Sequence, residues 1–224
     1  MHQIAPEVFQ LPLMPRNGIN AYLVGGVLVD TGVTASAKKL LAALRGRPIE
    51  AIALTHAHVD HAGSARRLAS ELDVPVWTGA ADREATETGK GVKKPVLDRP
   101  GLAPVADALG KFPSVPVARE LREGDELTAG FTVLDTPGHS PGHVSYWREA
   151  DGTLLCGDVF FNMHILTTVP GLREPVALFT HDPEQNRASE RKLAALAPSV
   201  VGFGHGPVLA DGAAAKMSAF VAAL

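Results

Sequence analysis

The sequence predicts an α+β fold in which two β-sheets pack face to face and helices cover the outside, within one domain of residues 1–224. Two observations predict it. Short apolar runs typical of strands occur in pairs with helix-periodic segments between them, and this order appears once in each half of the chain. No repeat of fixed period and no linker-like stretch divides the 224 residues, a length that suits one large domain.

The first half of the chain begins with two expected strands, residues 8–13 and 20–30. Between them, Asn17-Gly18 is a strong turn signal. Leu40, Leu41 and Leu44 recur at helical spacing, which predicts a helix around them. The elements expected after the first two strands are a helix at 35–45, a strand at 49–54, a helix at 63–72, a strand at 74–78 and a helix at 80–88.

The second half is interrupted by two stretches without sustained periodicity, residues 90–118 and 159–181. The first holds five prolines, and we interpret both as long loops of a kind that often serves function, with one short helix at 103–111. Asp182 followed by Pro183 is typical of a helix start. The other elements expected here are strands at 126–127, 131–135, 144–148, 153–156 and 200–203, and helices at 182–196 and 211–223.

The composition excludes several classes of partner. The formal net charge is −3 and the basic residues are scattered, so we expect no nucleic-acid surface. No apolar stretch reaches the roughly 18 residues of a membrane span, and the N-terminus lacks the basic start and apolar run of a signal peptide. We therefore expect no membrane partner and a cytoplasmic location, and the oligomeric state stays open. The single cysteine, Cys156, is expected to be a small buried residue.

A cluster of candidate metal ligands lies directly after the expected strand at 49–54. His56, His58, Asp60 and His61 fall within six residues. His56 and His58 alternate along an extended segment, so both can face one side of it. Imidazole nitrogens with a carboxylate oxygen suit ions such as zinc. We interpret the cluster as a metal site rather than as a chance grouping among the nine histidines.

The run His-x-His-x-Asp-His resembles the signature of the metallo-β-lactamase superfamily, and the resemblance extends over residues 20–207. The rest of that pattern follows in order, as Asp30 in Val-Asp-Thr-Gly, His139 in Pro-Gly-His-Ser-Pro-Gly-His, Asp158 in Cys-Gly-Asp-Val and His205 in Gly-His-Gly-Pro. It implies a four-layer αββα sandwich with two metal ions. It also implies that His56, His58 and His139 bind the first metal, that Asp60, His61 and His205 bind the second, and that Asp158 bridges both.

Such a centre implies hydrolysis of a small-molecule substrate. Three protein ligands and a share of Asp158 leave each metal an open position, and a metal-bound water can have a pKa near 7. The resulting metal-bound hydroxide would attack a carbonyl carbon, and Asp60 is the catalytic residue expected to orient it. Zinc is the expected ion, and iron and manganese suit the same ligands.

Several other residues can be interpreted in two ways. Asp30 could accept a ring N–H from a ligand histidine or cap its own turn. His143 could support the ligands or be an ordinary strand residue, and His164 and His181 bracket the loop at 159–181, where they could touch substrate. An apolar wall or core packing would explain Phe160, Phe161, Met163 and Ile165.

Departures from subgroup patterns narrow the reaction. Metallo-β-lactamases proper usually replace the bridging Asp with Cys or Ser, whereas this chain keeps Asp158. Quorum-quenching lactonases place a Tyr where this chain has Phe161. Glyoxalase II enzymes and persulfide dioxygenases carry a Gly-Cys-Gly-Arg-like run where this chain reads Asn162-Met-His-Ile. These departures leave a generic member of the superfamily, closest in outline to the short glyoxalase II-like hydrolases, and the resemblance implies a small ester, thioester or lactone as substrate. A mononuclear iron persulfide dioxygenase and a metal-binding protein without catalysis remain as alternatives.

Overall fold

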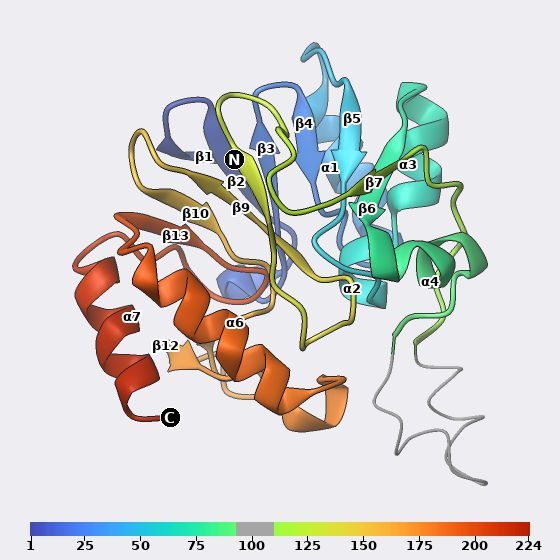
Figure 1. Ribbon diagram of the computed structural model, residues 1–224. Coiled ribbons are helices and arrows are strands. Elements are labelled where there is room, and N and C mark those ends of the chain that lie inside the picture. The colour runs from blue at the N-terminus through green and yellow to red at the C-terminus, as the bar shows by residue number, and fades with distance from the viewer. Residues whose placement is uncertain (93–109) are drawn as a thin grey trace, which may run out of the picture.

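The computed structural model describes residues 1–92 and 110–224. Its larger sheet has seven strands, of which the first four pair antiparallel (Figure 1). From the fourth strand onward the pairing is parallel. In sheet order the strands are β1 (His2–Ala5), β2 (Val8–Pro12), β3 (Asn20–Val24), β4 (Val27–Val29), β5 (Ala51–Ala53), β6 (Val76–Gly79) and β7 (Arg119–Leu121).

A second sheet of four strands faces the first, and a two-stranded sheet lies beside it. The second sheet has the order β13 (Val200–Gly202), β10 (Thr153–Leu155), β9 (Val144–Arg148) and β8 (Thr132–Asp135), and the small sheet pairs β11 (Phe161–Met163) with β12 (Pro170–Arg173). The α-helices of the described residues are α1 (Ala37–Leu44), α2 (Val59–Ala62), α3 (Ala65–Leu72), α4 (Arg83–Thr88), α6 (Pro183–Ala195) and α7 (Ala213–Ala222). Among the described residues, no helix has the length and apolarity that crossing a bilayer requires.

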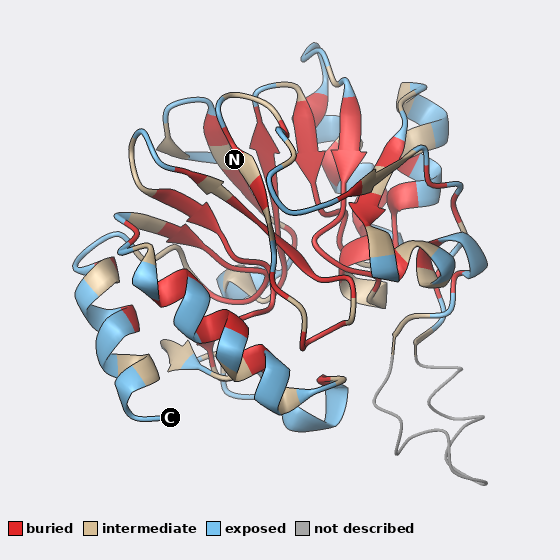
Figure 2. Cartoon of the chain, viewed as in Figure 1, coloured by how far each residue is buried: buried red, intermediate tan, exposed pale blue. Residues whose placement is uncertain are grey.

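Three apolar clusters hold four layers together. Because side chains alternate along a strand, Leu23 and Leu28 face the helical layer of α1 and α3, while Tyr22 and Val29 face the second sheet. The first sheet is thus buried on both faces, as Figure 2 shows for its central strands. On the far side, α6 and α7 cover the outer face of the second sheet (Figure 1). The structure confirms the predicted α+β sandwich.

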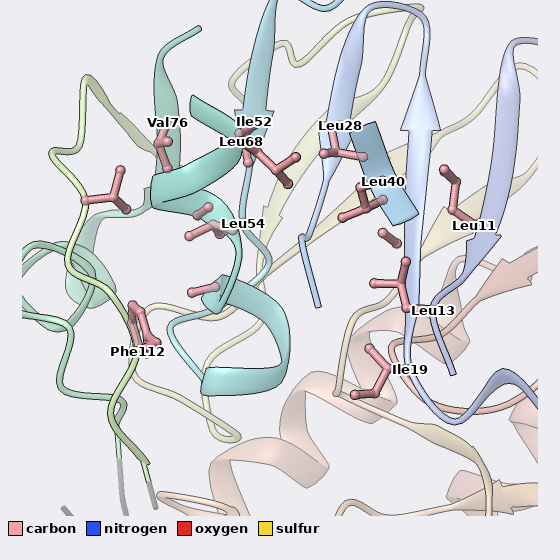
Figure 3. Packing of buried hydrophobic residues seen from close by; sticks show 14 of the residues in the cluster. Leu11, Leu13, Ile19, Leu28, Leu40, Ile52, Leu54, Leu68, Val76 and Phe112 are labelled. Carbon is pink, nitrogen blue, oxygen red and sulfur yellow. The ribbon is translucent and has the colours of Figure 1, made fainter. Parts of the chain in front are cut away.

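The outer cluster fixes the helices that follow β4 and β5. Figure 3 shows Leu40 of α1 close to Leu28 of β4, and Leu68 of α3 close to Ile52 of β5; all four are fully buried. Cutting any one of them to alanine would cost about 2–5 kcal/mol. Cys156 is buried in the cluster beneath α6 and α7, as predicted, and burial raises the pKa of its thiol.

Several predicted elements differ from the structure. The single strand expected at 20–30 is two strands, because Gly25, with a φ of +53°, turns the chain between β3 and β4. The strand expected at 126–127 is only a bridge from Glu126 to Thr132. The stretch 159–181 was expected to be a loop but contains β11 and β12, while β1 and β7 were not predicted. The expected helix at 103–111 lies almost wholly outside the described residues.

One buried carboxyl in α6 lacks a cationic partner at hydrogen-bond distance. Glu190 is fully buried, and its Oε1 accepts a hydrogen bond from Asn186 Nδ2 at 3.1 Å. Its Oε2 has no hydrogen-bond partner within the described parts of the chain. Burial, together with the negative charge of Glu174, raises the pKa of Glu190 to about 8.

This raised pKa makes stability depend on pH. The folded protein holds the Glu190 proton more tightly than the unfolded chain does, so the free energy of unfolding falls as pH rises from about 4.5 to about 8. Glu190→Gln should remove that contribution and stabilise the protein by about 1–3 kcal/mol at pH 8. Urea denaturation at pH 5 and pH 8 measures the pH dependence of the unfolding free energy and the stabilisation by Glu190→Gln. Glu184→Gln, at an exposed position of the same helix, is the control. An unchanged pH slope in the Glu190 variant would refute the assignment.

Candidate metal centre

The candidate ligands converge from loops that follow strands of both main sheets. His56 and His58 follow β5, and His139 follows β8. Asp158 follows β10, and His205 follows β13. Since β10 and β13 are parallel neighbours, their carboxyl ends meet at one edge of the second sheet. The short helix α2 carries the remaining two candidates, Asp60 and His61.

The structure brings together all seven residues that the sequence singled out. They form three overlapping groups in which the candidate ligand atoms lie within 4.8 Å of one another. The groups are His56, His58 and His139; Asp60, His61 and His205; and His56, His61 and Asp158.

Asp158 lies between the two histidine groups. Its Oδ2 is 3.2 Å from Nε2 of His205 and 3.4 Å from Nε2 of both His61 and His139. The distance to Nε2 of His56 is 3.9 Å. One carboxylate oxygen therefore faces four imidazole nitrogens, a position from which a carboxylate can serve two neighbouring ions.

Hydrogen bonds fix the ring orientation in the first group. The His58 Nε2–H donates to the Val92 carbonyl at 2.7 Å, which leaves Nδ1 as the ligand atom. The His56 Nδ1–H donates to Thr55 Oγ1 at 3.0 Å, because that hydroxyl already donates to a carboxylate. Nε2 of His56 and Nδ1 of His58 are then both unprotonated, and they lie 3.0 Å apart. Two lone pairs this close repel each other unless a proton or a metal cation lies between them.

The other rings are held in the same way. The His139 Nδ1–H donates to Thr180 Oγ1 at 3.2 Å, and the His205 Nδ1–H donates to the Gly18 carbonyl at 2.6 Å. His61 Nδ1 lies 2.8 Å from Oδ2 of Asp30. Acceptors of this kind fix the tautomer of a metal-binding histidine and strengthen its ligand nitrogen.

Buried ligand atoms without hydrogen-bond partners test whether metal ions fit this site. Nε2 of His61, Nε2 of His139 and Oδ1 of Asp158 are buried, and none finds a hydrogen-bond partner in the described ranges. Buried polar atoms without partners are costly, so protein interiors rarely contain them. Here both histidine nitrogens face Asp158, whose Oδ2 lies 3.4 Å from each of them. This set of nitrogen and carboxylate donors fits divalent cations.

The pKa shifts of the histidines differ between the two ligand groups. Burial lowers the pKa of His56 and of His139 well below the ordinary value, so both rings are neutral and can act as ligands. Burial alone would also lower the pKa of His205, but the carboxylates of Asp158 and Asp60 raise it to about 10. The carboxylates of Asp158 and Asp60 thus supply negative charge beside His205, which favours a cation there.

The structure shows the contacts of the residues that the sequence left with two interpretations. Asp30 accepts hydrogen bonds from Thr55 as well as from His61, so it supports the ligands. His143 is buried, stacks on His56 at 5.0 Å between centroids, and accepts a hydrogen bond from the Asp158 backbone N–H. The backbone N–H of His181 donates to the His139 carbonyl.

The other loop candidates divide between the site and the core. His164 Nδ1 accepts from the Thr167 backbone within the β11–β12 hairpin. The ring of Phe161 lies 4.5 Å from that of His205, whereas Phe160 packs against Phe220 in the core. Met163 is buried and Ile165 is exposed. Of the expected apolar wall, Phe161 is the residue in contact with a candidate ligand.

Sequence reasoning missed three residues that support the ligands, namely Thr55, Asp82 and Thr180. Thr55 directly precedes His56, so its position was the available signal. Asp82 and Thr180 are distant in sequence from the residues they contact, and nothing local distinguishes them.

Known proteins are similar to this chain over most of its length. The family model described as metallo-beta-lactamase superfamily matches residues 14–205. The probable metallo-hydrolase YflN of Bacillus subtilis (strain 168) is 31% identical over 91% of this chain and 81% of its own length. A hydroxyacylglutathione hydrolase of Cupriavidus metallidurans is 32% identical over 85% of this chain and 62% of its own length.

Solved structures show the same similarity. The crystal structure of TTHA1623 in a di-iron-bound form has 35% sequence identity and a TM-score of 0.70, and the match covers 93% of this chain and 98% of that one. The BLEG-1 B3 metallo-beta-lactamase has 29% identity and a TM-score of 0.65, with 90% and 93% covered.

Proposed function

Because this chain belongs to the metallo-beta-lactamase superfamily and is a hydrolase of that superfamily, we propose that its seven-residue centre binds two divalent metal ions and hydrolyses a small thioester. Esters and lactones are the related substrates of the same chemistry. The observation that carries the proposal is the position of Asp158 between two histidine groups, each complete enough for one ion. Hydroxyacylglutathione hydrolases at 28–32% identity favour the thioester among these substrates.

When bound, two divalent ions would supply an activated water near neutral pH and a Lewis acid for a carbonyl oxygen. The chain's own residues set where this chemistry occurs. Asp60 has a side chain 30% exposed, while those of His205 and Asp158 are each 3% exposed. Asp60 is therefore the carboxylate that substrate can reach, and its Oδ2 is 3.3 Å from Nε2 of His205. From there it can orient the nucleophile.

Exposed apolar side chains favour a substrate with an apolar acyl group. Apart from the terminal residues Met1 and Leu224, the exposed large hydrophobics of the described ranges lie in three segments. Each segment contains a residue that is hydrogen-bonded to a candidate ligand. In the first segment Gly18 bonds to His205, in the second Asn162 bonds to His205, and in the third Thr180 bonds to His139. These exposed residues are Met14, Ile165, Leu166, Val169, Leu178 and Phe179.

Metal analysis combined with a substrate panel tests the proposal. We expect about two equivalents of zinc, iron or manganese per chain, and loss of more than about 99% of activity after chelation that the added metal reverses. In a panel of thioesters, lactones, β-lactams and phosphodiesters, thioesters should give the highest kcat/KM, rising with acyl length. Asp158→Ala protein, prepared identically, controls for contaminating hydrolases. One equivalent of iron, with oxygen uptake on glutathione persulfide, would instead identify a dioxygenase and refute hydrolysis.

A further inference from the structure

Asp82 is a buried carboxylate at the end of the short helix η3 (Ala80–Asp82), directly before α4, and it is fully inaccessible to solvent. Three donors surround it. Its Oδ2 accepts from the Ala57 backbone N–H at 2.8 Å and from Ser140 Oγ at 2.6 Å. Its Oδ1 accepts from the Gly142 backbone N–H at 2.7 Å. Hydrogen bonds to an ionised carboxylate are among the stronger ones in proteins.

Two of these three donors are neighbours of candidate ligands in the sequence. Ala57 stands between His56 and His58, and Ser140 directly follows His139. One side chain therefore joins the loop after β5 to the loop after β8. Those two loops supply the whole of the first ligand group.

The backbone around Asp82 leaves no room for a looser arrangement. A Cβ on Gly142 would lie 2.2 Å from the Asp82 backbone nitrogen, and one on Gly79 would lie 1.9 Å from the Gly142 carbonyl oxygen. Any larger residue at either position would push the His139 loop away from η3. The carboxylate reaches both loops because these two glycines permit direct backbone contact.

We propose that Asp82 is a positioning residue for one half of the metal centre. It holds His56, His58 and His139 in a common geometry, while the second group has separate supports. His61 is held by Asp30, and His205 by the Gly18 carbonyl. The inference rests on the proposed two-metal function and adds that the first ion depends on Asp82, whereas the second does not.

The test compares zinc affinity in two backgrounds that each leave one ligand group complete. His205→Ala preserves the first group, and His139→Ala preserves the second. Asp82→Asn keeps the volume but places an N–H group against one of the donors, so it breaks the contact. With Zn²⁺ titrated against a chromophoric chelator, we expect its Kd to rise about 10–100-fold in the first background and less than about threefold in the second.

Two further variants control for a general loss of stability and for failure of Asp82→Asn to fold. Thr86→Val removes a buried hydroxyl of α4 that bonds the Asp82 carbonyl rather than its carboxylate, so it should lower Tm and leave both Kd values unchanged. If Asp82→Asn fails to fold, Ser140→Ala removes one donor only and should show the same selectivity with a smaller loss of about 3–10-fold.

The outcomes separate the two proposals. An unsubstituted protein that binds fewer than two zinc ions would refute the two-metal centre itself. If it binds two, and the Asp82 and Ser140 variants weaken both backgrounds equally or neither, then only the positioning role of Asp82 is refuted.

Discussion

Replacing Asp158 with alanine is expected to lower kcat/KM more than about 100-fold and to weaken the binding of both metal ions. The reason is its position. Oδ2 lies 3.2–3.4 Å from Nε2 of His205, His61 and His139, which belong to both ligand groups. Removing one carboxylate would therefore take a ligand from each of the two proposed ions and withdraw the negative charge that would balance them.

Kinetics on the preferred thioester and zinc titration against a chelator measure the two effects separately. Asp158→Asn separates charge from volume, because it keeps the shape and loses the charge; we expect it to fall between the wild type and the alanine variant. Asp211→Ala, at an exposed position, is the matched control. Full zinc occupancy together with unchanged turnover in Asp158→Ala would contradict the bridging role.

Replacing Asp30 with alanine is expected to lower the free energy of unfolding by about 3–5 kcal/mol. Its carboxylate accepts from the Thr55 backbone N–H, the Thr55 hydroxyl and the His61 ring, each at 2.8 Å. All of these groups are buried, so alanine would leave the donors unsatisfied. Zinc affinity should fall about 10–100-fold because the His61 ring loses its fixed orientation.

Urea denaturation with excess chelator present measures the first effect without any contribution from bound metal. Thr55→Val serves as the partial variant. It removes the hydroxyl that donates to Asp30 and accepts from His56 Nδ1, and it leaves the contact of Asp30 with His61 in place. A change in unfolding free energy below about 1 kcal/mol for Asp30→Ala would show that water replaces the lost acceptor.

The parts of the site that could be predicted from sequence are those with a local pattern. His56, His58, Asp60 and His61 were found because they crowd into six residues after a strand. His139, Asp158 and His205 came from the family resemblance, since nothing in their own spacing brings them to the same place. The fold class followed from apolar periodicity, which reports burial directly.

The parts that could not be predicted depend on contacts distant in sequence. Asp82 precedes a helix, where an Asp ordinarily caps the first turn, yet its side chain makes no capping hydrogen bond and instead reaches two loops. Strands β1 and β7 are three or four residues long and gain their pairing from a neighbouring edge rather than from an apolar run of their own.

The five candidate ligand rings have a consequence for which metal ion the proposed site would bind. Hydrogen bonds within the described parts of the chain set their orientation, through the carbonyls of Val92 and Gly18, the hydroxyls of Thr55 and Thr180, and the carboxylate of Asp30. Such a preorganised centre specifies coordination directions, and zinc, iron and manganese can all meet them. Exchange of one ion for another then needs no rearrangement of the chain, so the metal content of a preparation should follow the supply of ions in the cell that made it.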